Sequence, residues 1–162
     1  MFLFFLLGCV AESKDSASPV AEPSGEVQGA SQGDLLFRFA MDVDYMAEMQ
    51  EVAEGAFHGS IYLGDEVSSI GPEDGAEALQ HIFVEDVVLP TDGSPTEVLI
   101  EVKDLPASEV VVLGFLDSDG NADEDSPSPD SKDPVTLPSD NDFDVVGGAQ
   151  TEATIFFGFL NP

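Results

Sequence analysis

The segment EVVVLGFLD (residues 109–117) carries the strongest fold signal in this chain. Its apolar side chains fall on both alternating faces, which is typical of a strand that is covered on both sides. We therefore expect it to lie in the centre of a sheet. The residues that follow, SDGNADEDSPSPDSKD (118–133), are strongly acidic and rich in turn formers, and they predict a loop at the end of this strand.

Other strand candidates alternate with a period of two. In LFRFAMDVD (36–44), Phe37, Phe39, Met41 and Val43 are predicted to face inward. The further candidates are FHGSIYL (57–63), HIFVEDVVL (81–89), TEVLIEV (96–102, with Val98 inward) and ATIFFGFL (153–160). Short strands at this spacing predict an all-β fold, an antiparallel β-sandwich of about seven strands over residues 34–162.

The N-terminal residues predict export and attachment. The apolar run Phe2–Leu7 is far shorter than the roughly 20 residues that span a bilayer, so residues 1–8 are predicted to be a signal peptide. The sequence LLGC (6–9) resembles the lipobox of bacterial lipoproteins. That resemblance implies cleavage before Cys9 and lipid on its thiol. Val10, rather than Asp, follows the cysteine, and by the same resemblance this favours the outer membrane of a bacterial cell envelope.

Residues 9–33 are predicted to be a lipidated cysteine followed by a flexible tether. From Ala11 to Gly33 the chain is rich in Ser, Ala, Gly, Glu and Pro and has no apolar periodicity. Signal, lipid attachment and tether stand in the order expected of a domain that is held off a membrane surface.

The charge of the chain restricts its partners. It carries 33 acidic and 4 basic side chains, for a net charge of −29. Binding of nucleic acid is excluded, because neutralising phosphates requires many Lys and Arg side chains. The charge fits a cation or a cationic envelope protein as partner, and adaptation to salty water explains it equally well. The single cysteine rules out an internal disulfide.

A second resemblance concerns the domain itself. FHGSIYL (57–63), then EVKDLPASEVVVLGFLDSDGNAD (101–123), then the terminal strand are similar to the transthyretin-like (prealbumin-like) sandwich domains of secreted bacterial proteins. The similarity covers about residues 56–160, and Ser108 stands where that family's turn usually has Gly. It implies a sandwich fold and carries little information on function, because such folds host many unrelated roles.

The acidic loop is the candidate metal site. Its alternating oxygen ligands are Asp117, Asp119, Asn121, Asp123 and Asp125, with Asp130 or Asp133 able to complete the set. Ca²⁺, as a structural ion, is the expected cofactor, because it takes six to eight oxygen ligands at about 2.3–2.6 Å. The alternative is a hydrated loop without metal. A second acidic cluster, Asp140, Asp142 and Asp144, is a candidate to share the site.

Catalytic signals are weak in this sequence. His58 shares a strand face with Ser60 and Tyr62, His81 is isolated, and neither belongs to a zinc-type cluster. We therefore expect no enzyme. The predicted function is a lipid-anchored envelope protein whose β-sandwich is a structural or interaction module with a calcium-stabilised loop. The alternative is calcium-dependent binding of a small ligand or carbohydrate.

Overall fold

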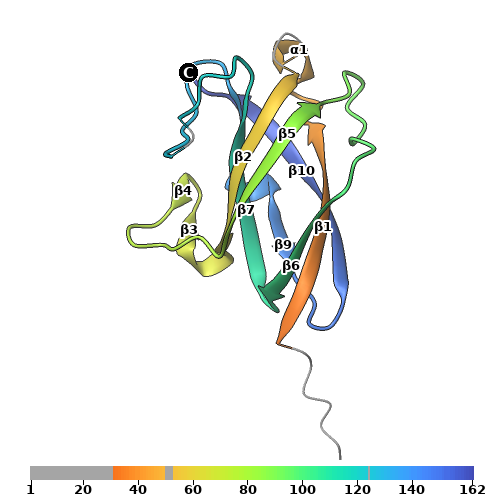
Figure 1. The fold of residues 1–162 in the computed structure, drawn as a ribbon, viewed down its shortest axis with the longest axis vertical. Coiled ribbons are helices and arrows are strands. Elements are labelled where there is room, and N and C mark those ends of the chain that lie inside the picture. The colour runs from red at the N-terminus through yellow and green to blue at the C-terminus, as the bar shows by residue number, and fades with distance from the viewer. Residues whose placement is uncertain (1–30, 50–52, 124) are drawn as a thin grey trace, which may run out of the picture.

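The computed structural model describes residues 31–49, 53–123 and 125–162, and these residues form an all-β fold, as predicted (Figure 1). The predicted signal peptide, Cys9 and most of the tether lie outside the described residues. The strands are β1 (Gln32–Met41), β2 (Glu54–Leu63), β3 (Val67–Ser68), β4 (Gly71–Pro72), β5 (Gln80–Val88), β6 (Ile100–Pro106), β7 (Glu109–Asp117), β8 (Pro134–Thr136), β9 (Asp142–Asp144) and β10 (Gln150–Leu160). Helical structure in the described part of the chain is confined to α1 (Met46–Met49) and two 3₁₀ turns, Gly64–Glu66 and Pro138–Asp140.

Strand β7 lies in the interior of the main sheet, as its apolar sequence predicts. The strand order is β5-β2-β7-β8-β10-β1-β6, and β9 also pairs with β7. Val110, Val112 and Leu116 point into the core and are fully buried. Val111 and Phe115, on the opposite face of the same strand, are also buried. An apolar run that is covered on both faces is therefore what the structure contains.

The sheet is mixed, because β1 and β10 run parallel, from Asp34 opposite Gln150 to Met41 opposite Phe157. The other strand pairs of this sheet are antiparallel. This pairing corrects the prediction of a purely antiparallel arrangement. Alternation in the sequence does not report strand direction, because a period of two results from either kind of pairing.

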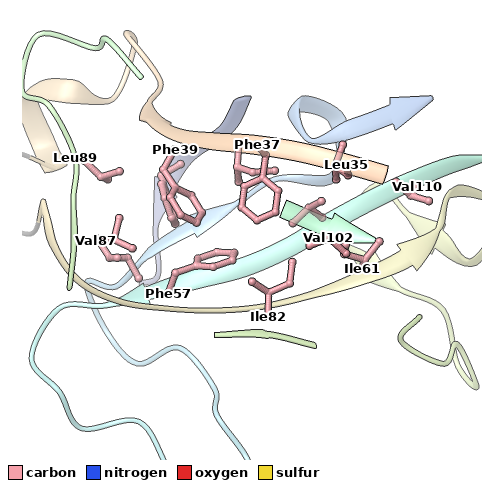
Figure 2. Packing of buried hydrophobic residues seen from close by; sticks show 14 of the residues in the cluster. Leu35, Phe37, Phe39, Phe57, Ile61, Ile82, Val87, Leu89, Val102 and Val110 are labelled. Carbon is pink, nitrogen blue, oxygen red and sulfur yellow. The ribbon is translucent and has the colours of Figure 1, made fainter. Parts of the chain in front are cut away.

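The main sheet curls, so that β1, β6 and β10 face β2, β5 and β7 across one hydrophobic core (Figures 1 and 2). Aromatic rings join the two halves. The ring centroid of Phe39 on β1 lies 4.7 Å from that of Phe57 on β2 and 5.9 Å from that of Phe157 on β10. Each of these rings is almost fully buried, and each contributes about 1.5–3 kcal/mol by leaving water.

Two predicted inward residues are exposed instead, because their strands are shorter than the alternation suggests. Val43 is 73% exposed, since β1 ends at Met41. Val98 is 65% exposed, since β6 begins only at Ile100. The segment before β6 is held at one point, where Thr96 exchanges hydrogen bonds with the backbone of Phe39. At both residues the apolar alternation of the sequence extends beyond the end of the strand.

The fold has two opposite ends, which we call proximal and distal. At the proximal end, where β1 begins, Ser31 accepts a backbone hydrogen bond of 3.0 Å from Ala107 in the turn between β6 and β7. At the distal end, β10 finishes and Leu160 pairs with Pro134 of β8. Because β1 and β10 are parallel, these ends lie at opposite sides of the molecule, as Figure 1 shows.

Candidate functional site

The acidic loop, residues 118–133, connects β7 to β8 at the distal end of the fold. The structure describes all of it except Glu124. The C-terminal residues lie beside it, because Asn161 donates a backbone hydrogen bond of 2.9 Å to Asp133 and accepts one of 2.7 Å from Lys132. The loop is therefore attached to rigid strands at both of its ends.

Asp117, the last residue of β7, organises the first turn of the loop. The residue is 5% exposed, and its carboxylate accepts backbone hydrogen bonds from Gly120 (2.9 Å), Asn121 (3.1 Å) and Ala122 (3.2 Å). Gly120 adopts a positive φ of 72°, which glycine accepts without strain. The carboxylate oxygens of Asp117, which the sequence pattern predicted to be metal ligands, thus accept hydrogen bonds from the backbone of the turn.

Asp133, the last residue of the loop, closes it. This side chain is 1% exposed. Its Oδ1 accepts hydrogen bonds of 3.2 Å from both the backbone N–H and the hydroxyl of Ser118, and its Oδ2 accepts one of 3.1 Å from the N–H of Asp130. Burial raises the pKa of Asp133, and the hydrogen bonds to Asp130 and Ser118 oppose that rise.

Asn121 brings two carboxylates together. Its Nδ2 donates to Asp119 Oδ2 at 2.9 Å and to Asp130 Oδ2 at 2.7 Å. The amide thereby uses both of its hydrogens on negatively charged acceptors. Asp119, Asn121 and Asp130 are the part of the loop where oxygen-bearing side chains converge.

The other two predicted ligands lie apart from this convergence. Asp123 is exposed, and its Oδ1 accepts the backbone hydrogen bond of Asp125 at 2.8 Å. Asp125 is also exposed and borders a hollow on the outer face of the sheet. In the part of the chain that the structure describes, no three His, Cys, Asp or Glu side chains are arranged to hold a metal ion.

Two residues of the second acidic cluster lie away from the loop. Asp142 and Asp144 lie on β9, where Asp144 pairs with Glu109 at the start of β7, the opposite end of that strand from Asp117. Asp140 is exposed and accepts a hydrogen bond from the Ser139 hydroxyl.

The two histidines share the hollow that Asp125 borders. This hollow has a volume of about 540 Å³ and lies on the outer face of β2 and β5. The ring of His58 stacks on Phe115, with centroids 5.3 Å apart and planes at 13°. His81 Nδ1 and the Ser60 hydroxyl are hydrogen-bonded at 2.8 Å. His58 and Ser60 share the outer face of β2, because Phe57 and Ile61, which flank them in sequence and lie on the other face, are fully buried.

Asn141 is a structural residue that the sequence did not single out. Its side chain is fully buried and donates to the carbonyls of Leu137 and Phe156, each at 3.0 Å, while its Oδ1 accepts from Phe156 N at 2.7 Å. The Asn141 amide therefore takes the place of a neighbouring strand's backbone at Phe156 of β10, next to the residues of β10 that pair with β8. An Asn inside the acidic sequence SDNDFD (139–144) gives no signal that would distinguish it from a surface residue.

Comparison of the chain with family models, with curated proteins and with solved structures finds no match. Among the described residues, no helix has the length and apolar character needed to cross a membrane.

Proposed function

We propose that this chain is a lipid-anchored protein of the bacterial cell envelope, attached at the outer membrane through Cys9. Its β-domain serves as an interaction module and has no catalytic activity. The support for the anchor is the order of an apolar segment, a lipobox-like LLGC and a Ser/Pro/Gly-rich tether in the sequence. The support for a transthyretin-like sandwich is the packing of two halves of a curled sheet across one core.

The observation that carries this proposal is the position of the acidic loop relative to the start of the domain. The chain enters the described domain at Ser31, at the proximal end, and the acidic loop stands at the distal end. A tether that leads from a membrane to Ser31 presents this loop and the neighbouring outer face away from the lipid. An anionic surface in that position also avoids repulsion by anionic head groups.

A Ca²⁺ ion in the acidic loop is part of the proposal. Asp119 and Asp130 already converge on the Asn121 amide. A half-turn of that amide presents its oxygen to the same point, which gives three oxygen donors of the kind that Ca²⁺ prefers. The ion would also relieve the repulsion between the two carboxylates. Its role is to hold the loop rather than to take part in chemistry.

Membrane fractionation tests the anchor. The full chain, expressed in a bacterium that processes lipoproteins, is expected to pellet with outer membranes and to require detergent for release. The Cys9→Ser variant, which cannot carry thioether lipid, is expected in the soluble fraction, because the remaining apolar run is too short to hold the protein in a bilayer. Membrane association of both forms alike would refute the lipid anchor.

A further inference from the structure

A groove crosses the outer face of β7 and β8, on the side of the sheet away from the core. One wall is the β3–β4 hairpin with Ile70 in its turn, and the other is the proline segment of the acidic loop, Pro127 and Pro129. In Figure 1 the hairpin and the acidic loop stand out from the same side of the sheet. We call this feature the outer groove, and its volume is about 570 Å³.

The outer groove is apolar. Its floor is formed by Leu113, Phe115, Val135 and Phe159. Phe159 is 41% exposed, and Ile70 on the hairpin wall is 95% exposed. Pro127 borders both this groove and the neighbouring hollow, which displays Phe83 at 57% exposure. Exposed apolar side chains that gather on one face mark an interaction surface.

The side chains of Thr136, Ser60 and His81 in this region are already engaged within the domain. The Thr136 hydroxyl accepts a hydrogen bond of 2.8 Å from Gly114 N and faces the carbonyls of Val112 and Gly114 at 3.3 Å. Ser60 and His81 bind each other. A carbohydrate needs several unused hydrogen-bonding groups for its hydroxyls, and among the described residues the only polar side chains that line the groove are those of Tyr62, Ser69 and Thr136. This mainly apolar surface therefore suits a polypeptide better than a sugar.

The charged side chains that border the hollow beside the groove are acidic. They are Glu85 and Asp125. Of the basic side chains in the described residues, Lys132 lies in the acidic loop itself. Arg38 and Lys103 lie on β1 and β6, in the other half of the curled sheet, and Lys103 is paired with Glu101 at 3.1 Å. With a net charge of −29, a second copy of the chain and an anionic membrane are both repelled. A basic partner is attracted.

The sheet edges are poorly suited to accept an added strand. β5 and β6 are the strands at the two ends of the main strand order, and each contains a non-glycine residue at positive φ, Asp86 at 54° and Asp104 at 58°. Such positions break the regular row of backbone donors and acceptors, and their charges face solvent at the edge. The face of the sheet is therefore the better docking surface.

We propose that the outer groove binds a basic, apolar segment of a partner protein, in which Lys or Arg side chains alternate with aliphatic ones. The aliphatic side chains pack on Leu113 and Phe159 between the two walls. The cations face Asp125 and Glu85. This inference rests on the proposed role of the domain as an interaction module, and it names the chemistry of the partner.

Peptide binding to the full chain carrying Cys9→Ser tests the proposal, at about 0.15 M salt to suppress long-range attraction. The probe is a short labelled peptide that repeats Lys-Leu-Gly, and the control peptide repeats Lys-Ser-Gly with the same charge and length. The leucine peptide is expected to bind at least about tenfold more tightly, because only it buries apolar surface. Equal binding of the two peptides would reduce the effect to charge alone and would overturn the inference.

Protein variants locate the binding surface. Ile70→Ser and Phe159→Ser are each expected to lower the affinity for the leucine peptide by about tenfold. Val98→Ser, which removes a comparably exposed apolar side chain from the segment before β6, is expected to leave affinity unchanged. Asp125→Asn is expected to weaken binding, and Glu152→Gln, on β10 of the other half, is the matched charge control. A loss of affinity at Val98 equal to that at Ile70 would overturn the groove assignment.

Other occupants give different results. Dimers in sedimentation that Ile70→Ser abolishes, or Ile70-dependent binding to phosphatidylglycerol vesicles, would each overturn the proposal in favour of a second copy or a lipid surface. Failure of the anchor is separately visible, because it alters the fractionation of the unmodified chain and leaves peptide binding in solution intact.

Discussion

The buried carboxylate of Asp133 accepts two hydrogen bonds from Ser118, one from its backbone N–H and one from its hydroxyl, both at 3.2 Å. These residues are the first and last of the acidic loop, so a single side chain joins the end of β7 to the start of β8. The loop is thereby closed by its own carboxylate.

The first prediction concerns Asp133→Asn and the pH dependence of stability. In the folded chain burial raises the pKa of Asp133 above its usual value of 3.8. The folded state therefore keeps the proton to higher pH than the unfolded state. The contribution of this group to the free energy of unfolding is complete below the usual pKa and is lost as pH rises through the folded pKa. The asparagine variant does not titrate, and its Nδ2 meets the N–H of Asp130, which costs about 1–3 kcal/mol.

Urea unfolding from about pH 3 to about pH 7 measures this effect. The stability lost in the variant is expected to be largest at the acid end and to shrink as pH rises. Repulsion among the remaining charges affects both proteins and cancels in the difference. Asp92→Asn is the control. Hydrogen bonds from Ser94 lower the pKa of Asp92, so the stability lost in this variant is expected to change with pH in the opposite direction. A difference for Asp133→Asn that is independent of pH would contradict the prediction.

The sequence predicted the core of this fold because the core depends on local alternation. Phe37 and Phe39 face inward as expected, and β7 is central because both of its faces are apolar. Alternation cannot predict strand direction or strand ends. The parallel pairing of β1 with β10 joins residues at the two ends of the described domain, and Val43 and Val98 continue the pattern beyond the sheet.

The second prediction concerns a close contact within the core. Gly59 on β2 and Gly114 on β7 are paired, and the ring of Phe57 lies over both of them. A Cβ on either glycine would stand 2.6 Å from a ring carbon. Gly59→Ala must therefore displace the ring, and we expect a loss of about 1–3 kcal/mol in the free energy of unfolding.

Gly158→Ala is the matched control, because its Cβ would meet Leu137 at an ordinary 3.5 Å. Its unfolding free energy is expected to stay equal or rise slightly, as the unfolded chain loses freedom. A double-mutant cycle with Phe57→Leu assigns the cause, since the smaller side chain should reduce the penalty of Gly59→Ala. An unchanged penalty in that background would show that the ring is not responsible.

The sequence predicted where the acidic loop lies in the fold, but not how its side chains are arranged. The acidic segment after a central strand marks the distal loop correctly. Which carboxylates converge depends on backbone turns and on partners far away in sequence. Asp117 and Asp133 turn inward to hold backbone N–H groups, whereas Asp119 meets Asp130 through Asn121. Spacing alone treats all of these carboxylates as equivalent.

The third prediction tests whether the acidic loop binds calcium or is held by hydrogen bonds alone. If Ca²⁺ binds where Asp119 and Asp130 converge, millimolar Ca²⁺ at about a hundred times its dissociation constant adds roughly 2.7 kcal/mol, or about 5–10 °C in Tm. Asp119→Asn and Asp130→Asn are expected to remove this gain, and Asp74→Asn, at an exposed turn, to keep it. Thermal melts with Ca²⁺, Mg²⁺ and chelator measure it.

The same melts distinguish two ligand sets. The sequence pattern places Asp123 and Asp125 in the site, with Asp130 or Asp133 completing the set, whereas the structure brings only Asp130 beside Asp119 and Asn121. If Asp123→Asn and Asp125→Asn abolish the calcium gain while Asp130→Asn retains it, the ligands are those of the sequence pattern and the loop rearranges around the ion. Identical melts in all three conditions would remove calcium from the proposal. The hydrogen bonds of Asp117 and Asp133 would then be sufficient to hold the loop.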